Sequence, residues 1–132
     1  MVGGGSIGPA DQALLDEARA AADSAYAPYS RFHVGAAVRA VDGRVITGAN
    51  VENASYPLGV CAERAALARA VAEGVRPGEV EAIAITASPC GGCRQWLLEF
   101  GPASVVFVDH AGDVLVRTPD ELLPDSFELT EQ

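Results

Sequence analysis

Three cysteines and one glutamate are the residues whose types and spacing could do chemistry. Cys90 and Cys93 form a Cys-x-x-Cys pair at the start of one predicted helix, and Cys61 stands at the start of another. Unpaired backbone N–H groups and the positive end of the dipole favour thiolates at helix N-termini. An odd number of cysteines excludes a closed disulfide framework, so the pattern indicates a metal site, redox chemistry or a chance arrangement.

The number of candidate ligands points to a catalytic rather than a structural metal. Structural zinc is almost always held by four protein ligands, whereas catalytic zinc keeps three and leaves one position open. The two histidines, His33 and His110, lie at no motif spacing to a cysteine, so we interpret them as ordinary strand or turn residues. Glu63, two residues after Cys61, could then act as a general base for a water molecule at the open position.

Other interpretations remain open for each of these residues. Glu63 could simply complement the helix dipole, and Arg64 could be a solvated helix residue rather than a hydrogen-bond donor to sulfur. A strand followed by Cys-Gly-Gly-Cys and a helix is also the layout of thioredoxin-like dithiol oxidoreductases, and a purely structural zinc module is a third possibility. A dithiol oxidoreductase has no need of Cys61-Ala62-Glu63, and a structural zinc module leaves Glu63 without a role, so the sequence favours a catalytic metal site.

Composition limits the size of the protein and its partners. The chain has 132 residues, 49% of them hydrophobic, and carries 9 Lys+Arg against 18 Asp+Glu, for a net charge of −9. This length predicts one domain with one real core. The absence of a basic cluster argues against nucleic-acid and anionic-membrane partners. With no signal peptide and no apolar run long enough to span a bilayer, we expect a cytoplasmic protein.

The predicted elements alternate in the manner of a layered α/β domain. A Gly-rich, flexible lead-in over residues 1–9 precedes a single domain over residues 10–132. Within that domain a helix starts at Asp11, and an alanine-rich face on it predicts close packing. Asp42-Gly43 predicts a hairpin between the first two strands. The strands are predicted at 32–41, 44–51, 81–87, 104–108 and 114–117, and further helices at 61–73 and 90–100.

At the level of whole motifs the chain resembles the small homotetrameric zinc-dependent cytidine deaminases. The resemblance extends in the family's order over about residues 11–127 and is carried by the segments 29–32 with 34–37, 50–56, 61–64 and 89–95, with a fainter likeness at 122–124 and Phe127. It implies a three-layer α/β/α sandwich with a central mixed sheet of about five strands. It also implies hydrolytic deamination of cytidine or deoxycytidine to uridine or deoxyuridine with release of ammonia, as in pyrimidine salvage.

The resemblance further implies roles for individual residues. Cys61, Cys90 and Cys93 would hold one Zn²⁺ per chain, Glu63 would shuttle protons, and Arg64 would support the cysteines. Substrate contacts would come from Asn50 and Glu52 to the ribose, from Phe32 and the Ala62 backbone to the base, and from Tyr56, with Phe127 reaching the pocket of a neighbouring subunit in a homotetramer.

Two further expectations concern the substrate. Asn50 and Glu52 are two residues apart at a strand end, so they project from one face and can grip one sugar hydroxyl. The net charge of −9 favours a free, neutral nucleoside over a base within a polynucleotide. A deaminase of another cytosine nucleoside, such as an antibiotic, remains an alternative. Trp96 matches no functional role and is assigned to packing.

Overall fold

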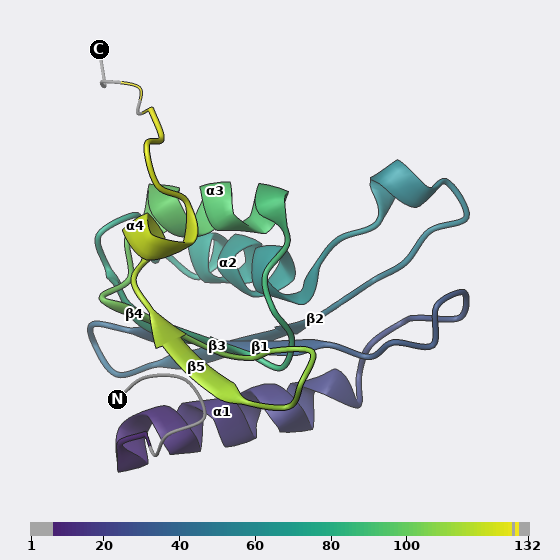
Figure 1. Ribbon diagram of the computed structural model, residues 1–132, viewed down its shortest axis with the longest axis horizontal. Helices are drawn as coiled ribbons and strands as arrows, with labels where there is room; N and C mark the ends of the chain where they lie inside the picture. Colours follow the sequence, from purple (N-terminus) through teal and green to yellow (C-terminus); the bar gives the residue numbers. More distant parts are fainter. Residues whose placement is uncertain (1–6, 128, 130–132) are drawn as a thin grey trace.

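A five-stranded mixed sheet lies between two layers of helices in the computed structural model, which describes residues 7–127 and 129 (Figure 1). One face of the sheet carries α1, and the other carries α2 and α3 with the short α4 beside α3. The predicted three-layer α/β/α sandwich is therefore confirmed. The strands are β1 (Gly35–Ala40), β2 (Val45–Ala49), β3 (Val80–Ile85), β4 (Ser104–Val108) and β5 (Val114–Arg117). The helices are α1 (Pro9–Ala22), the 3-10 helix η1 (Tyr56–Leu58), α2 (Ala62–Ala72), α3 (Gly91–Phe100) and α4 (Pro119–Leu122).

The strand order is β2-β1-β3-β4-β5, and β3–β4 is the parallel pair. Both neighbours of β1 run antiparallel to it, as do β4 and β5 to each other. The predicted hairpin joins β1 to β2, with Gly43 at a φ of 94° that glycine adopts without a steric penalty. A parallel pair needs a crossover connection, and α3 supplies it between β3 and β4. This crossover places the start of α3 close to the start of α2, which packs over β1 and β2.

Alternation along the central strands builds a separate core on each face of the sheet. On β3, Ala82 and Ala84 pack with α1, whereas Ile83 and Ile85 join the larger core beneath α2 and α3. The α1 side is closely packed, as its alanine-rich face predicts. A Cβ added to Gly35 would lie 1.9 Å from the carbonyl oxygen of Ala18, so only glycine allows α1 to approach β1 this closely.

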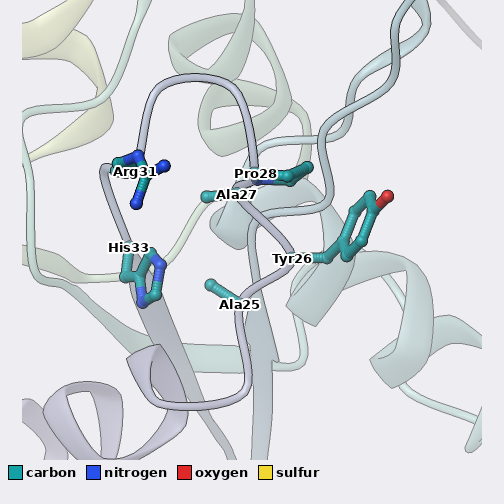
Figure 2. A pocket seen from close by; sticks show the side chains of 6 residues that line it. All are labelled: Ala25, Tyr26, Ala27, Pro28, Arg31 and His33. Carbon is teal, nitrogen blue, oxygen red and sulfur yellow. The ribbon is translucent and has the colours of Figure 1, made fainter.

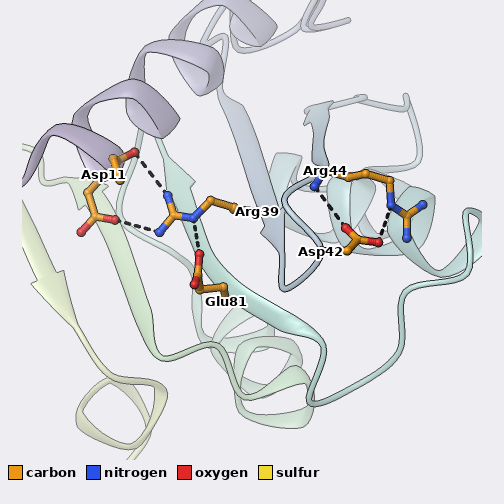
Figure 3. Close-up of polar contacts among 6 residues, drawn as sticks. Asp11, Arg39, Asp42, Arg44 and Glu81 are labelled. Carbon is orange, nitrogen blue, oxygen red and sulfur yellow. Dashed lines mark hydrogen bonds and ion pairs between the residues drawn. The ribbon is translucent and has the colours of Figure 1, made fainter.

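Ion pairs at the surface tie α1 to the sheet (Figure 3). Arg39 on β1 donates from Nε to Glu81 on the neighbouring β3 and from Nη2 to Asp11 at 3.4 Å, while its Nη1 donates to the Ala10 carbonyl at 3.2 Å. The same arginine thus links β1 to β3 and to the first turn of α1. Such partly exposed pairs contribute about 0–1 kcal/mol each, so they position the helix more than they stabilise the fold.

Several predicted boundaries differ from the structure. The first strand begins at Gly35 rather than residue 32, because the Asn50 side chain takes the place of a backbone partner at Phe32 and Val34. The first helix begins at Pro9, since proline is well suited to the first helical position. Residues 1–6 of the predicted lead-in lie outside the described residues. The two short helices η1 and α4 were not predicted, although Thr118 and Glu121 form a capping box on α4.

The length and apolar character of the helices decide whether one of them could span a membrane. None of those in residues 7–127 and 129 is both long enough and apolar enough to cross a bilayer.

Candidate active site

The three cysteines converge at the N-termini of α2 and α3. Cys61 is the N-cap residue of α2, Cys90 is the N-cap of α3, and Cys93 lies in the first turn of α3. Their sulfur atoms all lie within 4.8 Å of one another, and Sγ of Cys61 is 4.0 Å from Sγ of Cys90. The backbone N–H of Cys93 donates to Sγ of Cys90 at 3.4 Å. The predicted cluster is therefore assembled by the two helix starts that the sheet brings together.

The spacing of the sulfurs fits a tetrahedral zinc ion. With Zn–S bonds of about 2.3 Å, tetrahedral geometry requires sulfur atoms about 3.8 Å apart. The 4.0 Å between Cys61 and Cys90 is close to that value. Among the described residues, the side chains that converge as potential metal ligands are these three cysteines, and neither His33 nor His110 joins them. The cluster therefore fits one zinc per chain with three protein ligands.

Charge around the sulfurs is balanced by Arg64. Its Nη2 donates to Sγ of Cys61 at 3.4 Å, and its buried Nε has no hydrogen-bond partner among the described residues. The pKa of Cys61 is lowered to about 5, first by a hydrogen bond from the Cys93 thiol and then by Arg64. The same hydrogen bond, together with burial, raises the pKa of Cys93. Arg64 therefore favours the thiolate form of Cys61, which is the form that binds a metal ion.

Glu63 lies buried in the first turn of α2, with 3% of its surface exposed. Burial is the main cause that raises the pKa of Glu63 to about 7, and the negative charge of Cys61 acts in the same direction. A carboxyl group with a pKa near neutrality can both accept and release a proton at working pH, as a general acid–base catalyst must. Such a buried acid is costly for folding, so its role as a mere dipole complement is disfavoured.

The structure also brings Asn50, Glu52 and Phe32 together at the segment before β1, and the bridge between Val51 and Val60 places this segment beside the chain that enters α2 at Cys61. The Asn50 side chain accepts from the Val34 N–H at 2.8 Å and donates to the Phe32 carbonyl at 3.0 Å. The Glu52 carboxylate accepts hydrogen bonds from the backbone and hydroxyl of Ser30, and these lower its pKa. Both side chains therefore hold the segment before β1, and Glu52 stays ionised at neutral pH.

The remaining residues predicted to contact the substrate differ in their exposure to solvent. Ala62 is buried directly after Cys61. Tyr56 is 91% exposed in the segment that projects from the body between β2 and α2 (Figure 1), and Phe127 is 73% exposed after α4. Within residues 7–127 and 129, little of the chain covers either aromatic ring. Trp96 stacks on Phe100 with ring centroids 6.3 Å apart, which agrees with its assignment to packing.

A surface hollow of about 650 Å³ lies elsewhere, along the segment between α1 and β1 (Figure 2). It is lined by Ala25, Tyr26, Ala27, Pro28, Arg31 and His33. Arg31 and His33 stand on one side of it, and the Tyr26 ring points away from them. The hollow includes none of the cysteines and no Glu63, so the chemistry is assigned from the sulfur cluster and not from this hollow.

Three residues that support the site were missed by sequence reasoning. Ser30 contacts Glu52, and Arg94 donates to the carbonyls of Pro89 and Leu122 at 2.9 and 3.0 Å. Gly48 lets α2 approach β2, because a Cβ there would lie 2.4 Å from the Ala66 nitrogen. Ser30 and Arg94 lie inside the segments that carry the family resemblance. Their polar side chains within those segments were the sequence signal that could have identified them.

Fold and site together fit a class of zinc enzyme, since three cysteines at two helix starts could hold one ion beside a buried glutamate. The protein-family model described as "Cytidine and deoxycytidylate deaminase zinc-binding region" matches residues 9–109. The chain belongs to this deaminase family.

Individual relatives are similar in sequence to this protein over most of its length. It is 50% identical to a cytidine deaminase of Halalkalibacterium halodurans over 124 residues, which cover 88% of this chain and 92% of that protein. A cytidine deaminase of Mycobacterium tuberculosis H37Rv is 46% identical, with 89% and 90% covered. The crystal structure of cytidine deaminase from Burkholderia pseudomallei superposes with a TM-score of 0.82 at 50% identity, covering 88% of this chain and 98% of that one. These findings confirm the family and the fold, and the zinc-binding family model agrees with a cysteine cluster that fits one zinc per chain.

Proposed function

We propose that the protein catalyses the hydrolytic deamination of cytidine and deoxycytidine to uridine and deoxyuridine, with release of ammonia. The observation that carries this proposal is the buried Glu63 beside three convergent cysteines. The proposal is supported by relatives at 43–50% identity that are named cytidine deaminases. Family membership also favours it over dithiol redox chemistry at Cys90 and Cys93.

Cys61, Cys90 and Cys93 would hold the zinc ion, and Arg64 would donate a hydrogen bond to the Cys61 sulfur. When bound, Zn²⁺ supplies Lewis acidity that makes water a competent nucleophile at neutral pH. The three thiolates and one zinc ion sum to a charge of −1, which the guanidinium of Arg64 offsets. The role of Arg64 is therefore to keep the cysteines oriented and their charge compensated.

Glu63 would move the protons of the reaction. Its carboxylate takes one proton from the attacking water and delivers it to ring N3, which activates C4 for attack. A C4–O bond forms, and Glu63 then passes the second water proton to the exocyclic nitrogen so that the C4–N bond breaks and ammonia leaves. A pKa of about 7 suits both directions of transfer.

The substrate would be held by the edge of the site that Asn50, Glu52 and Phe32 form. Asn50 and Glu52 would bind a ribose hydroxyl, while the Phe32 ring and the Ala62 backbone would contact the base. The acidic surface, with a net charge of −9, repels polynucleotides and is compatible with a neutral nucleoside. The partner is therefore a free nucleoside and not a nucleic acid, and we propose a cytoplasmic location.

A homotetramer with shared pockets is part of the proposal. Large apolar side chains are exposed on the segments before β1 and between β2 and α2, namely Tyr26, Tyr29, Phe32, Tyr56 and Leu58. Exposed apolar side chains gathered in this way favour burial against a second chain. Tyr56 and Phe127 would then complete the pocket of a neighbouring subunit.

A subunit-mixing experiment tests this sharing. Tyr56→Ala and Glu63→Gln homo-oligomers should each be nearly inactive, but co-refolded mixtures should regain activity, because some pockets then combine an intact Glu63 with an intact Tyr56. Light scattering gives the subunit number. Mixtures no more active than their components would contradict a shared pocket.

The activity itself is tested by ultraviolet absorbance with cytidine and deoxycytidine, before and after zinc chelation. We expect an absorbance change that chelation abolishes and zinc restores, with about one zinc per chain. A reversible Cys90–Cys93 disulfide without tightly held zinc would favour the redox alternative. Turnover of a cytosine-bearing antibiotic but not of cytidine would favour the other nucleoside class.

A further inference from the structure

The hydrogen bonds of Glu52 leave it little free capacity. Its Oε1 accepts from the N–H groups of Tyr29 and Ser30 at 2.9 and 3.1 Å, and its Oε2 accepts from the Ser30 hydroxyl. A carboxylate offers about four acceptor positions, two on each oxygen. Three are in use, so one acceptor position on Oε2 is left for a ligand.

Asn50 is similarly committed to the chain. Its Oδ1 accepts from the Val34 N–H, and one N–H of its Nδ2 donates to the Phe32 carbonyl. A side-chain amide has two donors, so one N–H of Asn50 has no partner among the described residues. A free donor on Asn50 and a free acceptor on Glu52 match a single hydroxyl group, which accepts from the first and donates to the second.

Ser30 is the residue that connects these groups. Its hydroxyl donates to Oε2 of Glu52 and accepts from the Phe32 N–H at 2.9 Å. Arg31, at a left-handed φ of 59°, makes the turn that brings these two ends together. One hydroxyl therefore orients the Glu52 carboxylate and also holds the backbone of Phe32.

We propose that Ser30 is a positioning residue that orients Glu52 for its hydrogen bond with the sugar hydroxyl of the substrate. By occupying one position on Oε2, it directs the remaining acceptor of Glu52 toward that hydroxyl. This inference rests on the proposed function, because it assumes that Asn50 and Glu52 contact the sugar. Without Ser30, Oε2 loses its only side-chain donor among the described residues, and water can take the vacant position.

The test compares Ser30→Ala with the wild type on two substrates that differ in one hydroxyl, 2′-deoxycytidine and 2′,3′-dideoxycytidine. We expect kcat/KM for deoxycytidine to fall about tenfold, the factor that a hydrogen bond to a charged group is worth. For dideoxycytidine, which lacks the hydroxyl, kcat/KM should change by less than about twofold, because the contact at stake is absent.

Two further variants separate positioning from a general effect on the loop. Ser24→Ala makes the same change at another exposed serine between α1 and β1 and should leave both substrates unaffected. Ser30→Thr keeps the hydroxyl and should recover deoxycytidine activity to within about threefold of the wild type.

Each other outcome overturns the inference. An equal loss on both substrates would show that Ser30 only maintains the loop, and no loss on either would show that its hydroxyl is dispensable. If the wild type had the same kcat/KM for both nucleosides, the proposed contact to the sugar hydroxyl would be refuted, although deamination itself would stand. A wild type inactive on cytidine and both analogues would instead refute the proposed function itself.

Discussion

Replacing Glu63 with glutamine should stabilise the metal-free protein at high pH. The folded state raises the pKa of this carboxyl from 4.5 to about 7, mainly by burial. The unfolded chain therefore loses its proton more easily, so the free energy of unfolding falls as pH rises through this interval. The pKa values differ by about 2.5, and at about 1.4 kcal/mol per pKa unit the full penalty is about 3.5 kcal/mol, of which about 3 kcal/mol is present near pH 8. Glutamine carries no such penalty.

Urea unfolding of chelator-treated protein, followed by the fluorescence of Trp96, measures this difference. Glu63→Gln should exceed the wild type by about 3 kcal/mol near pH 8 and by only about 1.5 kcal/mol near pH 5.5, where protonation of the folded carboxyl removes part of the cost. Glu17→Gln, the same change at an exposed position on α1, serves as the control. A stability gain for Glu63→Gln that is equal at both pH values would refute the assignment of a buried, near-neutral carboxyl.

Three other changes have defined outcomes. Cys90→Ala should lose zinc and lower the melting temperature, because the ion joins the starts of α2 and α3; stoichiometric zinc in the purified variant would argue against the three-cysteine site. Arg94→Met should release zinc to a chromogenic chelator about tenfold faster, since Arg94 fixes the carbonyl before Cys90, whereas Arg76→Met, which removes similar contacts to Val71 and Val75, should not. Gly48→Ala should cost about 3 kcal/mol in urea unfolding, because its Cβ meets the backbone of α2, whereas Gly8→Ala, with open space around its Cβ, should cost less than about 1 kcal/mol.

Local patterns predicted most of the fold and the metal cluster. The strands 104–108 and 114–117 have the bounds observed for β4 and β5, since turns and β-branched residues delimit them clearly. The three cysteines could be found because ligand type and helix-start position are local properties. Their convergence within 4.8 Å depends on the β3–α3–β4 crossover, which follows from the general rules for parallel strands.

Long-range hydrogen bonds account for what the sequence did not predict. The strand predicted from Phe32 starts three residues later, because Asn50, 18 positions away, binds the Phe32 carbonyl. Ser30 and Glu52 are similarly separated by 22 positions. Periodicity describes the faces of single elements and carries no information about such pairs. Local sequence patterns also do not predict roles that depend on another subunit, as proposed for Tyr56 and Phe127.

The central claim is that Glu63 carries the proton transfers of a zinc-dependent deamination. Its most direct test is the turnover of cytidine by Glu63→Gln protein that has been shown to be folded and to hold one zinc per chain. General acid–base catalysis is worth about 10²–10⁴-fold, and Glu63 serves several transfers, so we predict a loss of at least about 10³-fold. A zinc-loaded Glu63→Gln protein that deaminates cytidine at a rate near that of the wild type would contradict the account.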